Sequence, residues 1–132
     1  MGYVVETANI YRKLILVSKE LYNLPLDEDL LHNVFKYKLF KKTEFLCMAG
    51  DIPDYLYFIY SGLIRFFYID YEGNEHIKDF FFEDQFASSY ASFLYRLPSP
   101  YYIEALEDTH ILQINYNNYI SNIENNKYWA EI

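Results

Sequence analysis

The sequence predicts a mainly β domain, a sandwich or jelly roll with flanking α-helices. Six or more short runs rich in aromatic and β-branched residues follow one another between residues 37 and 115, and turn residues separate them. Segments with helical patterns precede and follow these runs. Aromatic residues make up 21% of the 132 residues. This composition favours strands, although an AT-rich genome would also enrich tyrosine. The length predicts one domain.

Two helices are expected within residues 1–36, before the first strand. Residues 5–22 place apolar side chains in a roughly helical stripe. Residues 24–37 form a shorter helical pattern, with Pro25 at its start and three acids in its first turn. The positive end of the helix dipole favours acids at that position. Loose alternation begins at about residue 37, and we therefore expect the first strand there.

The segment Ser61-Gly62 separates two β-rich runs, residues 55–60 and 63–70. A two-residue connection of this type predicts a β-hairpin. A second turn, centred on Gly73-Asn74, leads into a further strand over residues 76–82. Chain reversals often need a positive φ, which glycine adopts without strain, so a glycine is well suited to each of these two turns.

The remaining residues complete the β-roll and close it with a helix. Residues 101–106 and 110–115 read as two more strands, and the polar residues after them predict a helix. We therefore divide the single domain into N-terminal helices (1–36), a β-roll (37–115) and C-terminal helical residues (116–132).

Composition and charge exclude several classes of protein. The net charge of −8 repels phosphate backbones, so nucleic-acid binding by this chain itself is not expected. The single cysteine, Cys47, cannot form an intrachain disulfide or a four-thiolate cluster. No signal peptide and no apolar run of about 18 residues is visible. We expect a cytoplasmic protein without membrane contact.

Residues for catalysis or metal binding are not gathered in any recognisable motif. His32, His76 and His110 are far apart in sequence and belong to different elements, so a metal site is not expected. The sequence contains no glycine-rich phosphate loop and no nucleophile elbow. We therefore expect neither enzymatic activity nor a cofactor, and Cys47 is expected to be a buried, small apolar residue.

Short motifs occur in an order that matches a known family. They are Gly50-Asp51, Leu56-Tyr57-Phe58-Ile59, Ser61-Gly62, Glu72-Gly73 and Ala105-Leu106-Glu107-Asp108. With this order and spacing, residues 25–125 resemble the effector domain of the Crp/Fnr transcription regulators. The resemblance implies a jelly roll of the cyclic-nucleotide-binding type, also described as a double-stranded β-helix.

The resemblance identifies residues 84–108 as a phosphate-binding cassette with altered chemistry. The Gly-Glu pair that opens the cassette helix in the family falls on Ser88 and Ser89. The family's arginine, ten residues after that glutamate, falls on Ser99, and its small neighbour falls on Pro100. Arginine binds phosphate through charge-assisted hydrogen bonds that serine cannot replace. The resemblance therefore implies a ligand other than cAMP or cGMP.

The resemblance also places three strand residues beside the ligand: Phe66, Lys78 and Phe81. Either Lys78 supplies the missing positive charge, or it is an exposed strand lysine. Either the two phenylalanines line the pocket, or they fill it. Similarly, Ser88 and Ser89 either bind an anionic ligand or only cap the helix that follows them.

Two arginines near the cassette are expected to be structural. Arg65 is the neighbour of Phe66 on one strand, so alternation directs Arg65 away from the pocket. Arg96 ends the cassette helix, where a positive charge suits the helix dipole.

The resemblance implies the sensor domain of a transcription regulator that responds to an unknown small-molecule effector. Residues 118–126 resemble the short helix after the roll, and residues 127–132 resemble the start of the long dimer helix. We expect a homodimer in the full-length protein, with DNA contacts only through a C-terminal domain absent from this chain, and we infer a truncation.

Two alternatives remain at this point. The same fold with a collapsed pocket could serve as a scaffold for dimerisation and polymerase contact. An unrelated cupin-like jelly-roll enzyme would need clustered histidine and glutamate ligands on neighbouring strands, and the scattered histidines argue against it.

Overall fold

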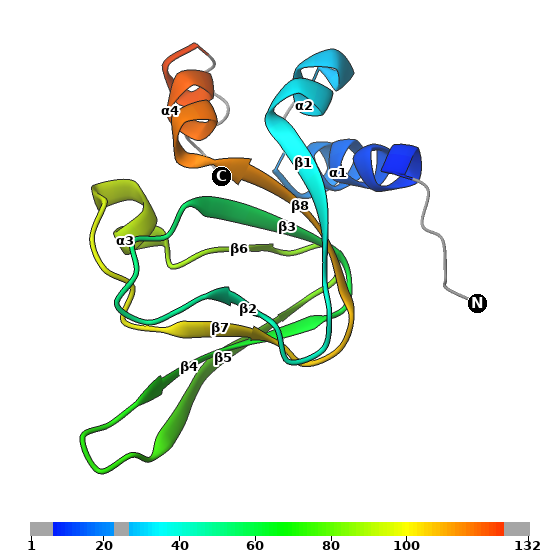
Figure 1. Ribbon diagram of the computed structural model, residues 1–132. Coiled ribbons are helices and arrows are strands. Elements are labelled where there is room, and N and C mark those ends of the chain that lie inside the picture. Colours follow the sequence, from blue (N-terminus) through cyan, green and yellow to red (C-terminus); the bar gives the residue numbers. More distant parts are fainter. Residues whose placement is uncertain (1–6, 23–26, 126–132) are drawn as a thin grey trace.

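The computed structural model describes residues 7–22 and 27–125 and confirms a mainly β jelly roll with flanking helices (Figure 1). In chain order the elements are α1 (Thr7–Tyr22), α2 (Glu28–Val34), β1 (Phe35–Phe40), β2 (Phe45–Cys47), β3 (Tyr55–Ser61), β4 (Leu63–Ile69), β5 (Glu75–Phe82), β6 (Phe86–Ala87), α3 (Tyr90–Tyr95), β7 (Tyr102–Ala105), β8 (Thr109–Asn115) and α4 (Tyr116–Asn125). None of the helices described is long and apolar enough to cross a membrane.

Two antiparallel sheets of four strands form the roll. Their strand orders are β1-β8-β3-β6 and β2-β7-β4-β5. Alternation along each strand turns one set of apolar side chains toward the opposite sheet. Ile59 on β3 and Ile64 on β4 are both fully buried in the cluster between the sheets. The hydrophobic core of the roll is therefore built from both sheets.

A second core lies between the helices and the β1-β8-β3-β6 sheet. Leu14 of α1, Leu31 of α2 and Phe93 of α3 are fully buried there with strand residues such as Phe58 and Leu112. Figure 1 shows α1, α2 and α4 gathered beside this sheet, with α3 below α4. The cassette helix is thus packed into the same core as the N- and C-terminal helices.

Helix α2 is shorter than the sequence pattern predicts. Asp27 is its N-cap, and the carboxylate accepts a hydrogen bond from the Asp29 N–H at 2.9 Å. The expected continuation to residue 37 is wrong, because Phe35 has extended backbone angles and pairs with Ile114 of β8. Burial of Phe35 against the sheet overrides the helical pattern. Pro25 and residues 127–132 lie outside the described residues.

The predicted hairpin at Ser61-Gly62 is wrong, because β3 and β4 belong to different sheets. Gly62 has a φ of +121°, and the chain crosses there from one sheet to the other. A short glycine connection permits either a hairpin or a crossing. Ile59 and Ile64 decide between them, because burying both side chains in the core between the sheets places the strands opposite each other.

The second predicted turn does form a hairpin, between β4 and β5. Gly73 has a φ of +86°, and the Asp70 carboxylate accepts hydrogen bonds from the N–H groups of Glu72 and Asn74, both at 2.9 Å. The imidazole of His76 lies 2.8 Å from Asp70 and is the main reason that the pKa of this carboxyl is lowered. The hairpin projects beyond the rest of the roll (Figure 1).

His110 on β8 makes stability depend on pH. Its Nδ1 is 2.7 Å from the Tyr37 hydroxyl, and burial lowers its pKa below the ordinary 6.5, partly opposed by Asp108. The unfolded chain therefore protonates first on acidification, and the stability contributed by neutral His110 is lost as the pH falls through about 6.5. We expect His110→Gln to show a smaller loss of unfolding free energy than the parent protein between about pH 7 and about pH 5.5 in urea titrations. An equally steep pH dependence in the variant would contradict this assignment.

Candidate functional site

Two buried serines, Ser88 and Ser89, lead into the short helix of the cassette, α3. Ser89 is the N-cap of α3, and its carbonyl accepts a hydrogen bond from the Phe93 N–H at 2.8 Å. Arg96 ends the helix in the left-handed region, with a φ of +56°, and the Leu97 N–H donates to the Ser92 carbonyl at 2.9 Å. These contacts fix a compact helix whose first turn faces the neighbouring strands.

A cavity of about 320 Å³ lies between this helix and the β4–β5 hairpin. Its walls come from β4, β5, the β6–α3 junction and the segment before β7. The lining residues are Phe66, Lys78, Asp79, Phe81, Ser88, Ser89, Tyr90, Ala91, Ser92, Pro100 and Tyr101. The fold therefore brings together every residue predicted for the site except Ser99.

Aromatic rings form the apolar wall of the cavity. The ring centroids of Phe66 and Phe81 are 4.8 Å apart, and those of Phe66 and Tyr101 are 6.2 Å apart. Phe66 is buried, whereas Phe81 and Tyr101 are half-buried. The rings pack on one another and leave a space within the size range of small-molecule pockets, which begins at roughly 300 Å³.

The two cassette serines differ in their hydrogen bonds. The Ser88 hydroxyl donates to the Tyr55 carbonyl at 3.0 Å and so ties the cassette to β3. Ser89 is only 7% exposed, yet its hydroxyl neither caps α3 nor bonds to another described residue. Because Ser89 lines the cavity, its hydroxyl can bond to a ligand or to water there.

Ser99 does not line the cavity, contrary to the sequence-based expectation. Its hydroxyl donates to the Tyr101 carbonyl at 2.8 Å and accepts from the Tyr101 N–H at 3.0 Å. Its backbone exchanges hydrogen bonds of 2.8 Å with Gly50 and Asp51. A hydroxyl is short enough to be satisfied within its own turn, so Ser99 holds the cassette loop against the β2–β3 connection.

The arginines near the cassette are held by the fold, as predicted. The Arg65 Nε is 2.7 Å from a Glu104 carboxylate oxygen, and its guanidinium lies over the Phe67 ring. The Arg96 guanidinium donates to the Pro53 carbonyl at 2.7 Å and lies over the Tyr116 ring. Within the described ranges, no guanidinium lines the cavity.

The cavity also contains residues that sequence reasoning missed, above all Asp79 and Tyr101. Asp79 was missed because strict alternation would place it on the opposite face from its neighbour Lys78. Tyr101 could have been predicted for the site, because it directly follows Pro100, which was already expected there. Tyr90, Ala91 and Ser92 likewise belong to the helix that the two serines introduce.

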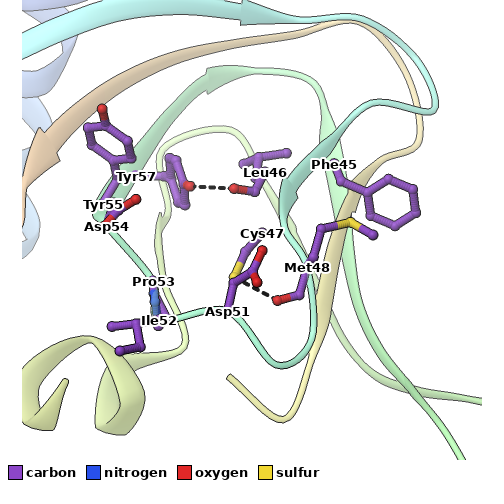
Figure 2. A pocket seen from close by; sticks show the side chains of 10 residues that line it. All are labelled: Phe45, Leu46, Cys47, Met48, Asp51, Ile52, Pro53, Asp54, Tyr55 and Tyr57. Carbon is purple, nitrogen blue, oxygen red and sulfur yellow. Dashed lines mark hydrogen bonds between the residues drawn. The ribbon is translucent and has the colours of Figure 1, made fainter. Parts of the chain in front are cut away.

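Figure 2 shows a second, smaller pocket of about 170 Å³ between β2 and the β2–β3 connection. Burial is the main cause that raises the pKa of the Cys47 thiol, and the carboxylates of Asp51 and Asp54 raise it further, while the Ser99 hydroxyl opposes them. A neutral thiol is a poor nucleophile and a poor metal ligand. Across residues 7–22 and 27–125, no group of three or more His, Cys, Asp or Glu could hold a metal ion.

Residues 37–126 match the model of the family described as cyclic nucleotide-binding domain. No curated protein matches the chain. Among solved structures, the sensor domain of the transcriptional regulator DNR from Pseudomonas aeruginosa superposes with a TM-score of 0.77 at 18% identity, covering 96% of this chain and 85% of that one. The catabolite activator protein of Thermus thermophilus has a TM-score of 0.74 at 23% identity, covering 86% of this chain and 52% of that one.

A third similar structure is the regulatory subunit of a cAMP-independent protein kinase A from Trypanosoma cruzi bound to guanosine. It has a TM-score of 0.70 at 16% identity, and the alignment covers 89% of this chain and 43% of that one. At these identities the likeness establishes the fold. By the covered shares, this chain spans about half the length of the activator and less than half the length of the kinase subunit.

Proposed function

Because this chain belongs to the cyclic nucleotide-binding domain family, we propose that it is a ligand-sensing domain whose cavity accepts a small molecule other than cAMP or cGMP. The observation that carries this proposal is the cavity of about 320 Å³ behind the cassette, since none of its lining residues is an arginine or a glutamate. The shape of a ligand site is retained, while its charges differ from those that a cyclic nucleotide needs.

The missing charges would cost a cyclic nucleotide much of its affinity. Its phosphate carries one negative charge and is best held by a guanidinium, but the corresponding position is Ser99, whose hydroxyl is occupied by Tyr101. Its ribose hydroxyl needs an acceptor such as a carboxylate, but the corresponding position is Ser89. Each hydrogen bond to a charged group is worth about 1.5–3 kcal/mol, so two losses remove several orders of magnitude in affinity.

An open cavity supports a sensor rather than a scaffold with a collapsed pocket. The rings of Phe66 and Phe81 pack against each other at a tilt and leave space beside them. Ser89 lines this space, and because its hydroxyl does not cap α3, it remains available to a ligand. Both features are those of a site that awaits a small polar molecule.

We also propose a regulatory role for this domain. Two of the similar structures are a catabolite activator protein and the sensor domain of a transcriptional regulator. We assign this chain the same kind of role, as the non-enzymatic sensor of a cytoplasmic Crp/Fnr-type regulator. In that role the full-length protein is a homodimer, and its DNA contacts come from a further C-terminal domain.

Isothermal titration calorimetry tests the exclusion of cyclic nucleotides. We expect no saturable heat from cAMP or cGMP at ligand concentrations up to roughly 100 µM. A dissociation constant below about 10 µM for either nucleotide would contradict the proposal. A thermal-shift screen of nucleosides, aromatic acids and short organic acids tests the open cavity, since a ligand of the folded state raises the melting temperature. Silence across the whole screen would favour a collapsed pocket.

A further inference from the structure

Resting on the proposed function, we infer that the ligand of this cavity is a small aromatic zwitterion, such as an aromatic α-amino acid. Its ring would lie against the aromatic wall. Its carboxylate and ammonium groups would lie at the rim, beside Lys78 and Asp79. Both of these residues line the cavity and are exposed to solvent.

A β-bulge places the two opposite charges on one wall. In the β4–β5 ladder Phe66 is opposite Asp79, but the next residue, Phe67, is opposite Ile77. Lys78 is therefore an extra residue in β5. Neighbouring residues of a regular strand point to opposite faces, whereas a bulge can turn both toward one face. Here the bulge brings both Lys78 and Asp79 to the cavity.

The two charges do not neutralise each other. No ion pair joins Lys78 to Asp79, and among the described residues neither is paired with any other charged group. One oxygen of the Asp79 carboxylate accepts a hydrogen bond from the Phe80 N–H at 2.8 Å. This bond fixes the carboxylate without cancelling its charge.

A ligand with a single charge fits this wall poorly. A carboxylate beside Lys78 would be attracted by the ammonium and repelled by the neighbouring Asp79, and an amine would meet the reverse. The protein's net charge of −8 further disfavours an anionic ligand. A zwitterion, whose two charges lie close together, can place its carboxylate beside Lys78 and its ammonium group beside Asp79 while carrying no net charge.

The interior of the cavity complements the rest of such a molecule. Phe66, Phe81 and Tyr101 offer ring faces and edges, and aromatic pairs favour offset or edge-to-face contact. The cavity thus combines an aromatic interior with a dipolar rim.

Three probes with the same phenyl skeleton test the inference by isothermal titration calorimetry. L-Phenylalanine has both charges, 3-phenylpropionate has only the carboxylate, and 2-phenylethylamine has only the ammonium. Exposed ion pairs contribute up to about 1 kcal/mol each, so we expect L-phenylalanine to bind about threefold to fivefold more tightly than either single-charge probe.

Two variants that each remove one charge identify the groups involved. We expect Lys78→Gln to weaken 3-phenylpropionate and to strengthen 2-phenylethylamine, each by about threefold, and Asp79→Asn to have the reverse effects. Lys42→Gln is the matched control: it removes an exposed lysine of the β1–β2 turn, outside the cavity lining, and should leave all three affinities unchanged. Melting temperatures of the variants show that each one is folded.

The outcomes separate the two proposals. Equal binding of the three probes, or the absence of opposite effects in the two variants, would overturn the zwitterion and leave a ligand-sensing cavity in place. If none of the three probes binds while another class in the thermal-shift screen does, the zwitterion is likewise overturned and the sensor function stands. If neither the probes nor the screen gives binding, both proposals fail.

Discussion

Gly62→Ala is expected to lower the free energy of unfolding by about 4 kcal/mol, the sum of a strained backbone and a steric clash. The φ of +121° at Gly62 is outside the conformations that an alanine adopts readily. A Cβ atom there would lie 2.6 Å from the Cα of Thr109 and 2.3 Å from its Oγ1. Backbone atoms of a paired strand cannot give way cheaply, so the crossing between the two sheets would be disrupted. Urea titration followed by far-ultraviolet circular dichroism measures the effect.

Gly73→Ala is the matched control for this prediction. Gly73 also has a positive φ, of +86°, but a Cβ atom there would meet nothing within 4 Å. It therefore tests backbone strain alone, which costs about 1–3 kcal/mol. If Gly62→Ala destabilises the protein no more than Gly73→Ala, the close contact between the crossing and Thr109 is not a determinant of the fold.

Phe93→Ala is expected to cost about 3–5 kcal/mol, the range for truncating a fully buried phenylalanine. Phe93 is 0% exposed in the core beneath the cassette helix. Its ring meets those of Tyr116 and Tyr119 of α4 edge-on, with centroids 5.7 Å and 5.4 Å away. The substitution would leave a cavity between α3 and α4, and it would loosen the cassette from the C-terminal helix as well as destabilise the domain.

Tyr95→Ala on the same helix is the control, because Tyr95 is 74% exposed. We expect it to change the unfolding free energy by no more than about 0.5 kcal/mol, as is usual for exposed positions. Denaturant titrations of both variants give the comparison. A Phe93→Ala effect within about 1 kcal/mol of the Tyr95→Ala effect would show that the cassette helix does not depend on this core.

Much of the fold could be predicted from short-range patterns. The strand periodicity, the Gly73 turn and the helix after two serines are local features, and each is confirmed. The connection at Ser61-Gly62 is different, because the same two residues can join paired strands or strands of opposite sheets. Only the burial of Ile59 and Ile64 in one core decides this, and burial depends on the whole fold.

The side chains of the candidate site could likewise be predicted only in part from the sequence. The spacing of the motifs placed Ser89 at the family's glutamate position and Ser99 at its arginine position, so both were expected beside the ligand. Only Ser89 lines the cavity, because the Ser99 hydroxyl is satisfied within its own turn. The placement of Lys78 and Asp79 on one wall of the cavity depends on a bulge. A bulge is a property of the register between two strands, and the sequence of one strand does not reveal it.

Chemical-shift mapping by two-dimensional NMR tests the central claim most directly, since it locates the ligand as well as detecting it. The protein is titrated in parallel with cAMP and with the tightest-binding probe of the phenyl series. We expect the probe to shift amides of residues 88–92 and 78–81, around the cavity, and cAMP to leave them unchanged at the same concentration. Saturable shifts of the cassette amides by micromolar cAMP, or probe-induced shifts confined to residues outside the cavity, would contradict the account.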